Sequence, residues 1–144
     1  MEITAGKGID KLLFGMKTSH VETLLGRPDL NFKDDDKNVI YVYNESRLRL
    51  TFYEDEDFRL GYFICANQEA TLSGSKVIGQ TVEEIKNTLP KSFKTWETER
   101  FDIATNHFNE ANWLILQEEF GHVSKVEIGA VINDKDELEW AFKS

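Results

Sequence analysis

Apolar and polar residues alternate along two stretches of this chain, and each stretch follows a short segment with helical spacing. Alternation with a period of two is the pattern of a half-buried strand. It predicts strands at 38–43, 47–53 and 59–66 in the first stretch, and at 100–105, 111–117 and 124–132 in the second. A last alternating segment, 137–143, predicts a closing strand with an inner face of Leu138, Trp140 and Phe142.

An internal repeat with an offset of 64 residues organises the chain. The segment LFGMKTSHVETLLGRP matches the later segment VIGQTVEEIKNTLP, so that Gly15 falls on Gly79 and Val21 on Ile85. The offset continues into the strands, where Ile64 falls on Ile128. A repeat of this length is typical of a duplicated supersecondary unit. The sequence therefore predicts one domain built of two repeats, about 1–72 and 73–144.

Both predicted helices begin with the pattern of a capping box, in which a hydroxyl and a carboxylate satisfy the free backbone N–H groups of the first turn. The pairs are Ser19 with Glu22 and Thr81 with Glu84. After the first helix, Gly26 suits the left-handed position that ends a helix.

A helix followed by a small antiparallel meander cannot bury a good core alone. We therefore predict an α+β fold in which two tandem helix-plus-antiparallel-meander modules share one sheet, with both helices on one face. The expected core is Leu48, Leu50, Phe52, Tyr62, Ile64, Leu114, Leu116, Val126 and Ile128. The other face carries Arg47, Arg49, Thr51 and Tyr53 in one strand and Trp113, Ile115 and Gln117 in another, so we expect a partner to bind there.

The first helix region resembles a known group of small modules. Its residues Phe14-Gly15-Met16-Lys17-Thr18, followed by Val21, Leu24, Leu25, Gly26 and Pro28, resemble the signature of the BamE/SmpA and β-lactamase-inhibitor-protein group. The resemblance implies tandem helix-plus-strand modules that act as binders, whether enzyme inhibitors, envelope assembly lipoproteins or immunity-type proteins. It also implies binding through the exposed sheet face and its loops, without catalytic residues.

Composition narrows the partner class. The 144 residues carry 26 acidic and 17 basic side chains, for a net charge of −9. This charge disfavours direct binding of nucleic acid, which draws its affinity from Lys and Arg, and favours a basic protein partner. A single cysteine excludes an intramolecular disulfide.

Acidic clusters next to aromatic residues are the candidate binding surface. In the simpler interpretation, these charges lie in solvated loops and keep the protein soluble. In the functional interpretation, they steer a cationic partner towards aromatic residues that anchor it. The candidate partner-binding residues are Asp34, Asp35, Asp36, Tyr53, Glu54, Asp55, Glu56, Asp57, Phe58, Trp113, Glu118, Glu119 and Phe120. A further acidic run at 134–139 has the alternation of a calcium loop but lacks the glycine and the final glutamate of an EF-hand.

No pattern of catalytic or metal-binding residues emerges. His20, His107 and His122 are widely spaced, and Cys65 lies in an apolar strand where it is expected to be a core residue. Paired carboxylates for glycoside hydrolysis remain open, since nothing selects a pair. We therefore expect no enzyme activity, no metal and no cofactor.

These features favour an immunity or inhibitor protein that neutralises a cognate bacterial toxin, with a basic nuclease as the favoured class, by occluding its active site. The alternatives are an envelope assembly module of BamE/SmpA type and a small-ligand-binding protein. The N-terminal segment lacks the apolar run of a signal peptide, and no run is long enough to span a membrane, so a cytoplasmic location is expected. The oligomeric state stays open.

Overall fold

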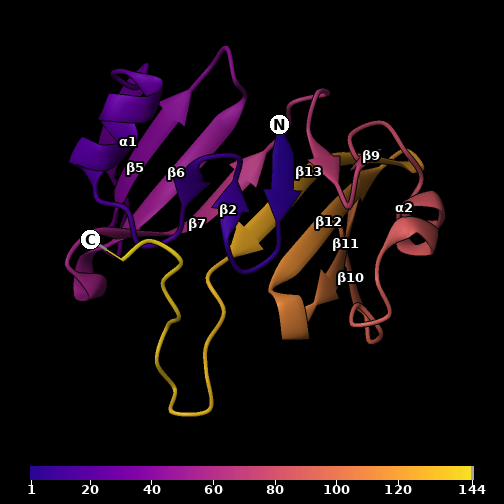
Figure 1. Ribbon diagram of the computed structural model, residues 1–144. Helices are drawn as coiled ribbons and strands as arrows, with labels where there is room; N and C mark the ends of the chain where they lie inside the picture. The colour runs from indigo at the N-terminus through magenta and orange to yellow at the C-terminus, as the bar shows by residue number, and fades with distance from the viewer. Residues whose placement is uncertain (144) are drawn as a thin grey trace.

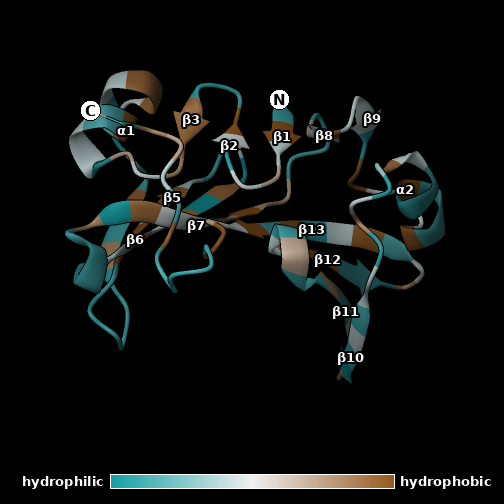
Figure 2. Ribbon diagram, turned by 60° about the horizontal axis from the view of Figure 1, so that its bottom comes forward, coloured by the Kyte–Doolittle hydropathy of each residue, from teal (hydrophilic) through white to brown (hydrophobic). Residues whose placement is uncertain are grey.

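A computed structural model describes residues 1–143, and it has two layers (Figure 1). One layer is an eight-stranded antiparallel sheet. The other consists of two helices with a small five-stranded sheet between them, all on the same side of the large sheet (Figure 2). The fold is thus mixed α and β with mostly strands, as the sequence predicted.

The large sheet contains strands from both halves of the chain, in the order β10-β11-β12-β13-β7-β6-β5-β4. The first half supplies β4 (Leu30–Lys33), β5 (Val39–Tyr43), β6 (Leu48–Tyr53) and β7 (Arg59–Cys65). The second half supplies β10 (Glu97–Phe101), β11 (Ala104–Asn109), β12 (Leu114–Glu119) and β13 (His122–Gly129). Corresponding strands of the two meanders therefore lie at equal distances from the central β7·β13 pair.

The second layer contains α1 (Thr18–Leu25), α2 (Val82–Thr88) and the small sheet. The order of the small sheet is β3-β2-β1-β8-β9. Its strands are β1 (Glu2–Thr4), β2 (Gly8–Ile9), β3 (Leu12–Leu13), β8 (Thr71–Leu72) and β9 (Ser75–Lys76). The prediction of a single sheet is not confirmed, because the structure has this second, small sheet. Its strands have only two or three residues and are too short to show alternation in the sequence.

The core lies between the two layers. Cross-strand register aligns Leu50, Phe63, Ile128 and Leu114 in one row across the four central strands, and all four are fully buried. Opposed residues of neighbouring strands share a face of the sheet, so this row defines the core face. The predicted core residues Leu48, Leu50, Phe52, Leu114, Leu116, Val126 and Ile128 are all buried.

Tyr62 and Ile64 are corrections to the predicted core. The register of β6 and β7 shifts between Thr51 and Phe52, which leaves Gly61 as an extra residue in β7. Phe63 and Cys65 consequently face the core, and Tyr62 and Ile64 face the other side. Ile64 and Ile128, which the sequence repeat matches, thus lie on opposite faces of the sheet. The prediction failed because β7 is apolar at every position from 62 to 65, so its sequence does not show which residues face the core.

Two predicted strands of the second half have different bounds. The segment 100–105 crosses the turn between β10 and β11, and 111–117 begins in a short 3-10 helix, η2 (Glu110–Asn112). Most of β10 was missed because its five residues are all exposed and show no apolar face. An equivalent 3-10 turn in the first half, η1 (Glu54–Glu56), joins β6 to β7.

The predicted closing strand at 137–143 is not a strand. Within this segment the structure has one isolated bridge, between Ile132 and Leu138. The chain then runs back towards α1, where the Phe142 N–H donates to the Phe14 carbonyl and the Phe142 ring lies 4.6 Å from the His20 ring. The aromatic residues of this segment therefore pack towards the helix layer and do not extend a sheet.

One of the two predicted helix caps is confirmed. In α2 the Thr81 hydroxyl accepts the Glu84 N–H at 3.1 Å, and the Thr81 N–H donates to the Glu84 carboxylate. Helix α1 instead begins after Lys17, whose N–H donates to Nδ1 of His20 at 3.1 Å. The Ser19 cap was wrong because an imidazole nitrogen replaced the expected hydroxyl and carboxylate.

These caps predict unequal effects of two similar substitutions. Thr81→Ala removes the N-cap acceptor of α2 and should lower the free energy of unfolding by about 1 kcal/mol. Ser19→Ala changes an exposed side chain inside α1 and should stay within about 0.5 kcal/mol of the wild type. Urea denaturation followed by circular dichroism measures both, and equal losses at the two positions would contradict the assignment.

Candidate functional site

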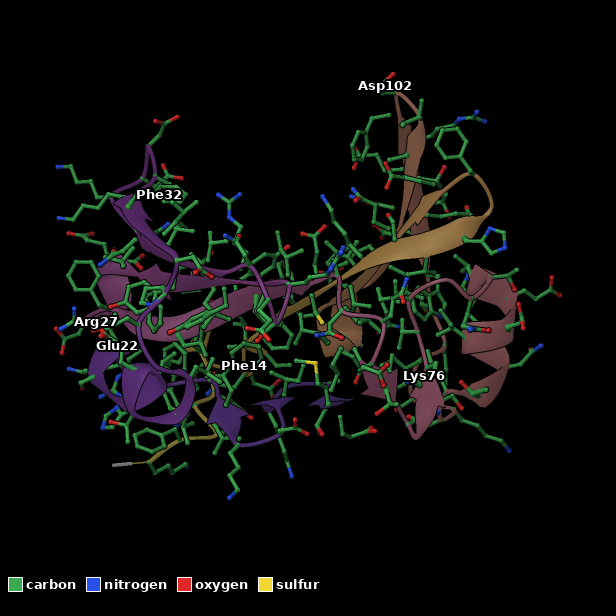
Figure 3. The ribbon with its side chains drawn as sticks, turned by 90° about the horizontal axis from the view of Figure 1, so that it is seen from above. Phe14, Glu22, Arg27, Phe32, Lys76 and Asp102 are labelled. Atoms are coloured by element: carbon green, nitrogen blue, oxygen red, sulfur yellow. The ribbon has the colours of Figure 1, made fainter. Side chains whose placement is uncertain are left out.

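One face of the large sheet is packed against the helix layer, and no described residue forms a layer over the other. We call this second side the open face. The two outer hairpins, marked by Phe32 and Asp102, project on the side away from the helices, so the sheet is curved around this face (Figure 3). Register and alternation place on it Leu30, Phe32, Val42, Arg49, Thr51, Tyr53, Tyr62, Ile64, Phe108, Trp113, Ile115 and Glu127.

Aromatic rings over the central strands, near one end of the open face, lie directly on glycine backbone. A Cβ atom added to Gly129 would come within 1.9 Å of the Trp113 ring, and one added to Gly61 within 2.1 Å of the Tyr53 ring. Tyr62 is paired with Gly129 across the β7·β13 ladder. Only glycine leaves room for these rings, so the backbone fixes their positions.

The fourth ring of this group is Phe108, which meets Trp113 edge to face with centroids 5.1 Å apart. This is a favourable arrangement for two aromatic rings. We refer to Tyr53, Tyr62, Phe108 and Trp113 as the aromatic group. All four side chains are half-buried. The group is therefore held in place while part of its surface stays accessible.

The two phenols in this group are neutral hydrogen-bond donors at ordinary pH. Burial is the main cause that raises the pKa of Tyr62, and the hydrogen bond that its hydroxyl donates to the Glu127 carboxylate raises it further. Burial, followed by the charge of Asp55, raises the pKa of Tyr53. The open face thus combines neutral aromatic groups with nearby carboxylates.

The acidic candidates of the first half come together at one end of the sheet. Residues 34–36 form the β4–β5 turn, and 54–57 form η1 and the turn into β7. The Glu54 N–H donates to the side-chain oxygen of Asn38 at 3.0 Å, which ties the two turns to each other. Trp113, at the start of β12, lies at this same end because β12 runs away from it. We call residues 34–36 and 54–57 the acidic end.

The remaining candidates lie elsewhere. Glu118, Glu119 and Phe120 are at the β12–β13 turn, which the alternation of strand directions places at the opposite end of the sheet. Phe120 is 83% exposed. Phe58 is instead next to the acidic end, in the turn into β7, and is half-buried against the core. The predicted residues therefore form two separate groups and not one continuous surface.

One member of the acidic end is compensated by a cation. The ammonium group of Lys17 donates a hydrogen bond to the Asp57 carboxylate. This hydrogen bond, together with the positive charge, holds the pKa of the Asp57 carboxyl below its usual range. The net negative field of this turn consequently comes from Glu54, Asp55 and Glu56.

A hollow of about 580 Å³ adjoins the aromatic group, and sequence reasoning missed it. Its walls include Phe108 and Trp113 together with the charged residues Lys94, Glu97 and Glu110. The hollow forms where the loop before β10 meets β11 and η2. The loop mixes polar residues with Phe93 and Trp96, and β10 is mostly polar, so neither shows a sequence pattern that marks the hollow.

The remaining chemical groups of interest are the possible metal ligands, the single thiol and the acidic run at 134–139. Among residues 1–143, no group of three or more His, Cys, Asp or Glu side chains is placed to hold a metal ion. The Cys65 thiol is buried in the core, and burial raises its pKa. The 134–139 segment is a turn whose N–H groups at Lys135 and Glu137 bind the Asn133 side chain. Helices in the described part of the chain are too short to cross a bilayer.

Comparison with known protein families finds no match, and comparison with curated protein sequences finds none either. Solved structures do share the fold. An extracellular protein containing a SCP domain from Bacillus anthracis matches with a TM-score of 0.53 and 11% identity, over 91% of this chain and 50% of that one. A cysteine-rich secretory protein from Staphylococcus aureus matches with a TM-score of 0.50 and 16% identity, over 79% and 43%.

A DUF4309 family protein from Bacillus subtilis has a TM-score of 0.49 and 15% identity, over 86% of this chain and 82% of that one. At these identities the likenesses concern the fold alone. This chain spans half or less of the length of the first two proteins.

The ion pair at the acidic end predicts a specific titration. The carboxyl group of Asp57 should titrate below the usual range of an exposed aspartate, and Lys17→Met should return its pKa to that range. Because the folded-state pKa is lowered, the pair's contribution to stability is present at neutral pH and is lost as pH falls through that pKa. Carboxyl-carbon NMR measures the titration. Lys11→Met, which removes an exposed lysine elsewhere, should leave Asp57 unchanged.

Proposed function

We propose that this chain is a non-enzymatic protein-binding module that holds a basic protein partner on its open face. The observation that carries the proposal is the aromatic group, whose rings are seated on the backbone of Gly61 and Gly129 with nothing described above them. Tyr and Trp held rigidly in a partly desolvated position are the side chains that dominate protein interfaces. Without rings packed on the sheet face, a side chain at position 61 or 129 would meet no steric obstacle from them.

Charge supports a basic partner. The chain carries a net charge of −9, and the acidic end places the carboxylates of Glu54, Asp55 and Glu56 beside the same end of the sheet as Trp113. Carboxylates around an apolar centre attract a cationic surface and orient it before contact. The acids thus speed association, and the aromatic group supplies the affinity.

The partner class that we propose is a cognate bacterial toxin domain, most simply a basic nuclease. The chain would act in the cytoplasm as its immunity or inhibitor protein. Occlusion is the mechanism, because a curved sheet face that covers a cationic substrate cleft keeps substrate out of it. We also propose that the two halves are copies of one module of the BamE/SmpA or β-lactamase-inhibitor-protein type.

A second candidate is a module that acts outside the cytoplasm, such as an envelope assembly module. The observation that favours it is that two proteins of the same fold are described as extracellular and secretory. Fractionation of the source cells distinguishes the two compartments. A third candidate, small-ligand binding, would use the hollow beside Trp113.

The test of the open face uses charge placed at its centre. Thr51→Arg with Gln117→Arg puts two cations on the open face at polar, half-buried positions. The tagged chain captures its partner from a source-cell lysate, and the purified partner is titrated against each variant. We expect the double variant to lose at least about tenfold in affinity through charge repulsion. If the partner is a toxin, this variant also fails to restore growth on co-expression.

The matched control places the same charges on the helix layer. Ser19→Arg with Asn87→Arg alters exposed residues of α1 and α2. This variant should bind the partner and protect cells as the wild type does. Equal affinity of both double variants would reject the open face as the binding surface. Growth that is unaffected by the captured partner would reject the toxin assignment.

Steering by the acidic end predicts a salt-dependent rate. Neutralising Glu54, Asp55 and Glu56 together should slow association with the captured partner at low ionic strength, with little change in the dissociation rate. At high salt the wild type and the variant should converge, since screening removes the field of exposed charges. Stopped-flow fluorescence measures both rates, and an unchanged association rate at low salt would contradict steering.

A further inference from the structure

The outer strand β10 has an unused edge. It is the last strand of the large sheet on the second-half side, and all five of its residues are exposed. Only β11 pairs with it in the described chain, so one side of its backbone has no partner strand. An edge strand of this kind is a ready template for pairing with another chain.

The side chains of β10 on the open face form an ordered row. Register with β11 opposes Glu97 to Phe108, Glu99 to Asn106 and Phe101 to Ala104. Two carboxylates are therefore followed by a phenylalanine that is 46% exposed. A complementary strand has two cations and then an aliphatic residue along its matching face.

A second copy of this chain does not fit the edge. Antiparallel pairing of β10 with itself about its centre sets Glu99 against Glu99, and like charges directly opposite are destabilising. The net charge of −9 on each copy adds repulsion. The occupant is consequently another protein that carries basic residues.

The hollow beside Trp113 begins where β10 begins. Glu97 is in its wall together with Glu110, Phe108 and Trp113, and Lys94 is the one cation among these charged residues. Neighbouring strands lie about 4.8 Å apart, so a long side chain opposite Glu97 reaches over β10 towards this space. Arginine fits best, because its planar guanidinium pairs with carboxylates and stacks on aromatic rings.

We propose that β10 binds an extended strand of a basic protein partner by backbone pairing. The added strand places arginine opposite Glu97, lysine opposite Glu99 and an aliphatic residue opposite Phe101. This inference rests on the proposed function and specifies how part of the partner is bound. The other edge strand, β4, has the same exposure but has no carboxylate and adjoins no such hollow.

The test uses a synthetic peptide with the strand core Leu-Glu-Lys-Thr-Arg, flanked by Thr-Val at each end, which is complementary to β10 in the antiparallel direction. A charge-reversed peptide with the core Leu-Lys-Glu-Thr-Glu is the comparison. Binding at low salt is followed by NMR, with amide hydrogen exchange of the whole chain. We expect the first peptide to bind, to protect amides of β10 and to shift the indole signal of Trp113, and β4 amides to stay unchanged.

Two variants with equal net charge test the role of the row. Glu97→Gln with Glu99→Gln should lower the affinity for the first peptide about fivefold, as expected for the loss of two exposed ion pairs. Glu45→Gln with Glu83→Gln removes two exposed acids, in the β5–β6 turn and in α2, and should leave the affinity unchanged. Melting curves establish that both variants are folded. Equal weakening by the two variants would show nonspecific charge attraction and overturn the proposal.

The remaining outcomes are also decisive. No binding up to millimolar peptide, equal binding of the charge-reversed peptide, or protection that is absent from β10 would each overturn the edge proposal. These failures are separate from failure of the proposed function. A partner that is captured equally by the wild type and by Glu97→Gln with Glu99→Gln, but lost with Thr51→Arg and Gln117→Arg, leaves the open face intact and rejects the edge.

Discussion

The antiparallel pairing of β7 with β13 is the constraint on which the rest of the structure depends. It joins the two meanders into one sheet and sets Phe63 against Ile128 in the middle of the core. Each meander alone would leave the apolar edge of its last strand unpaired, and a four-stranded sheet would bury too little surface to be stable. The pairing removes both edges and builds one core under the helix layer.

The same central strands create the open face. The extra residue Gly61 shifts the parity of β7, so that Tyr62 faces outward although the repeat predicted it in the core. Gly61 and Gly129 then accept the rings of Tyr53 and Trp113. A local irregularity in one strand therefore places the Tyr62 side chain on the open face and not in the core.

Sequence reasoning succeeded where burial imposes a pattern and failed where it does not. Strands β5, β6 and β7 were found because one face of each is packed. The exposed strand β10 and the short strands of the small sheet were missed, since neither shows alternation. The acidic and aromatic candidates were identified from composition, but strand direction, which sends Glu118 to one end and Trp113 to the other, is a property of topology.

The two remaining edges of the large sheet differ in length and in charge. Strand β4 has four residues, and none of them is acidic. Strand β10 has five residues, two carboxylates on one face and the aromatic hollow at its start. The basic strand proposed above would therefore find matching carboxylates at β10 and none within β4.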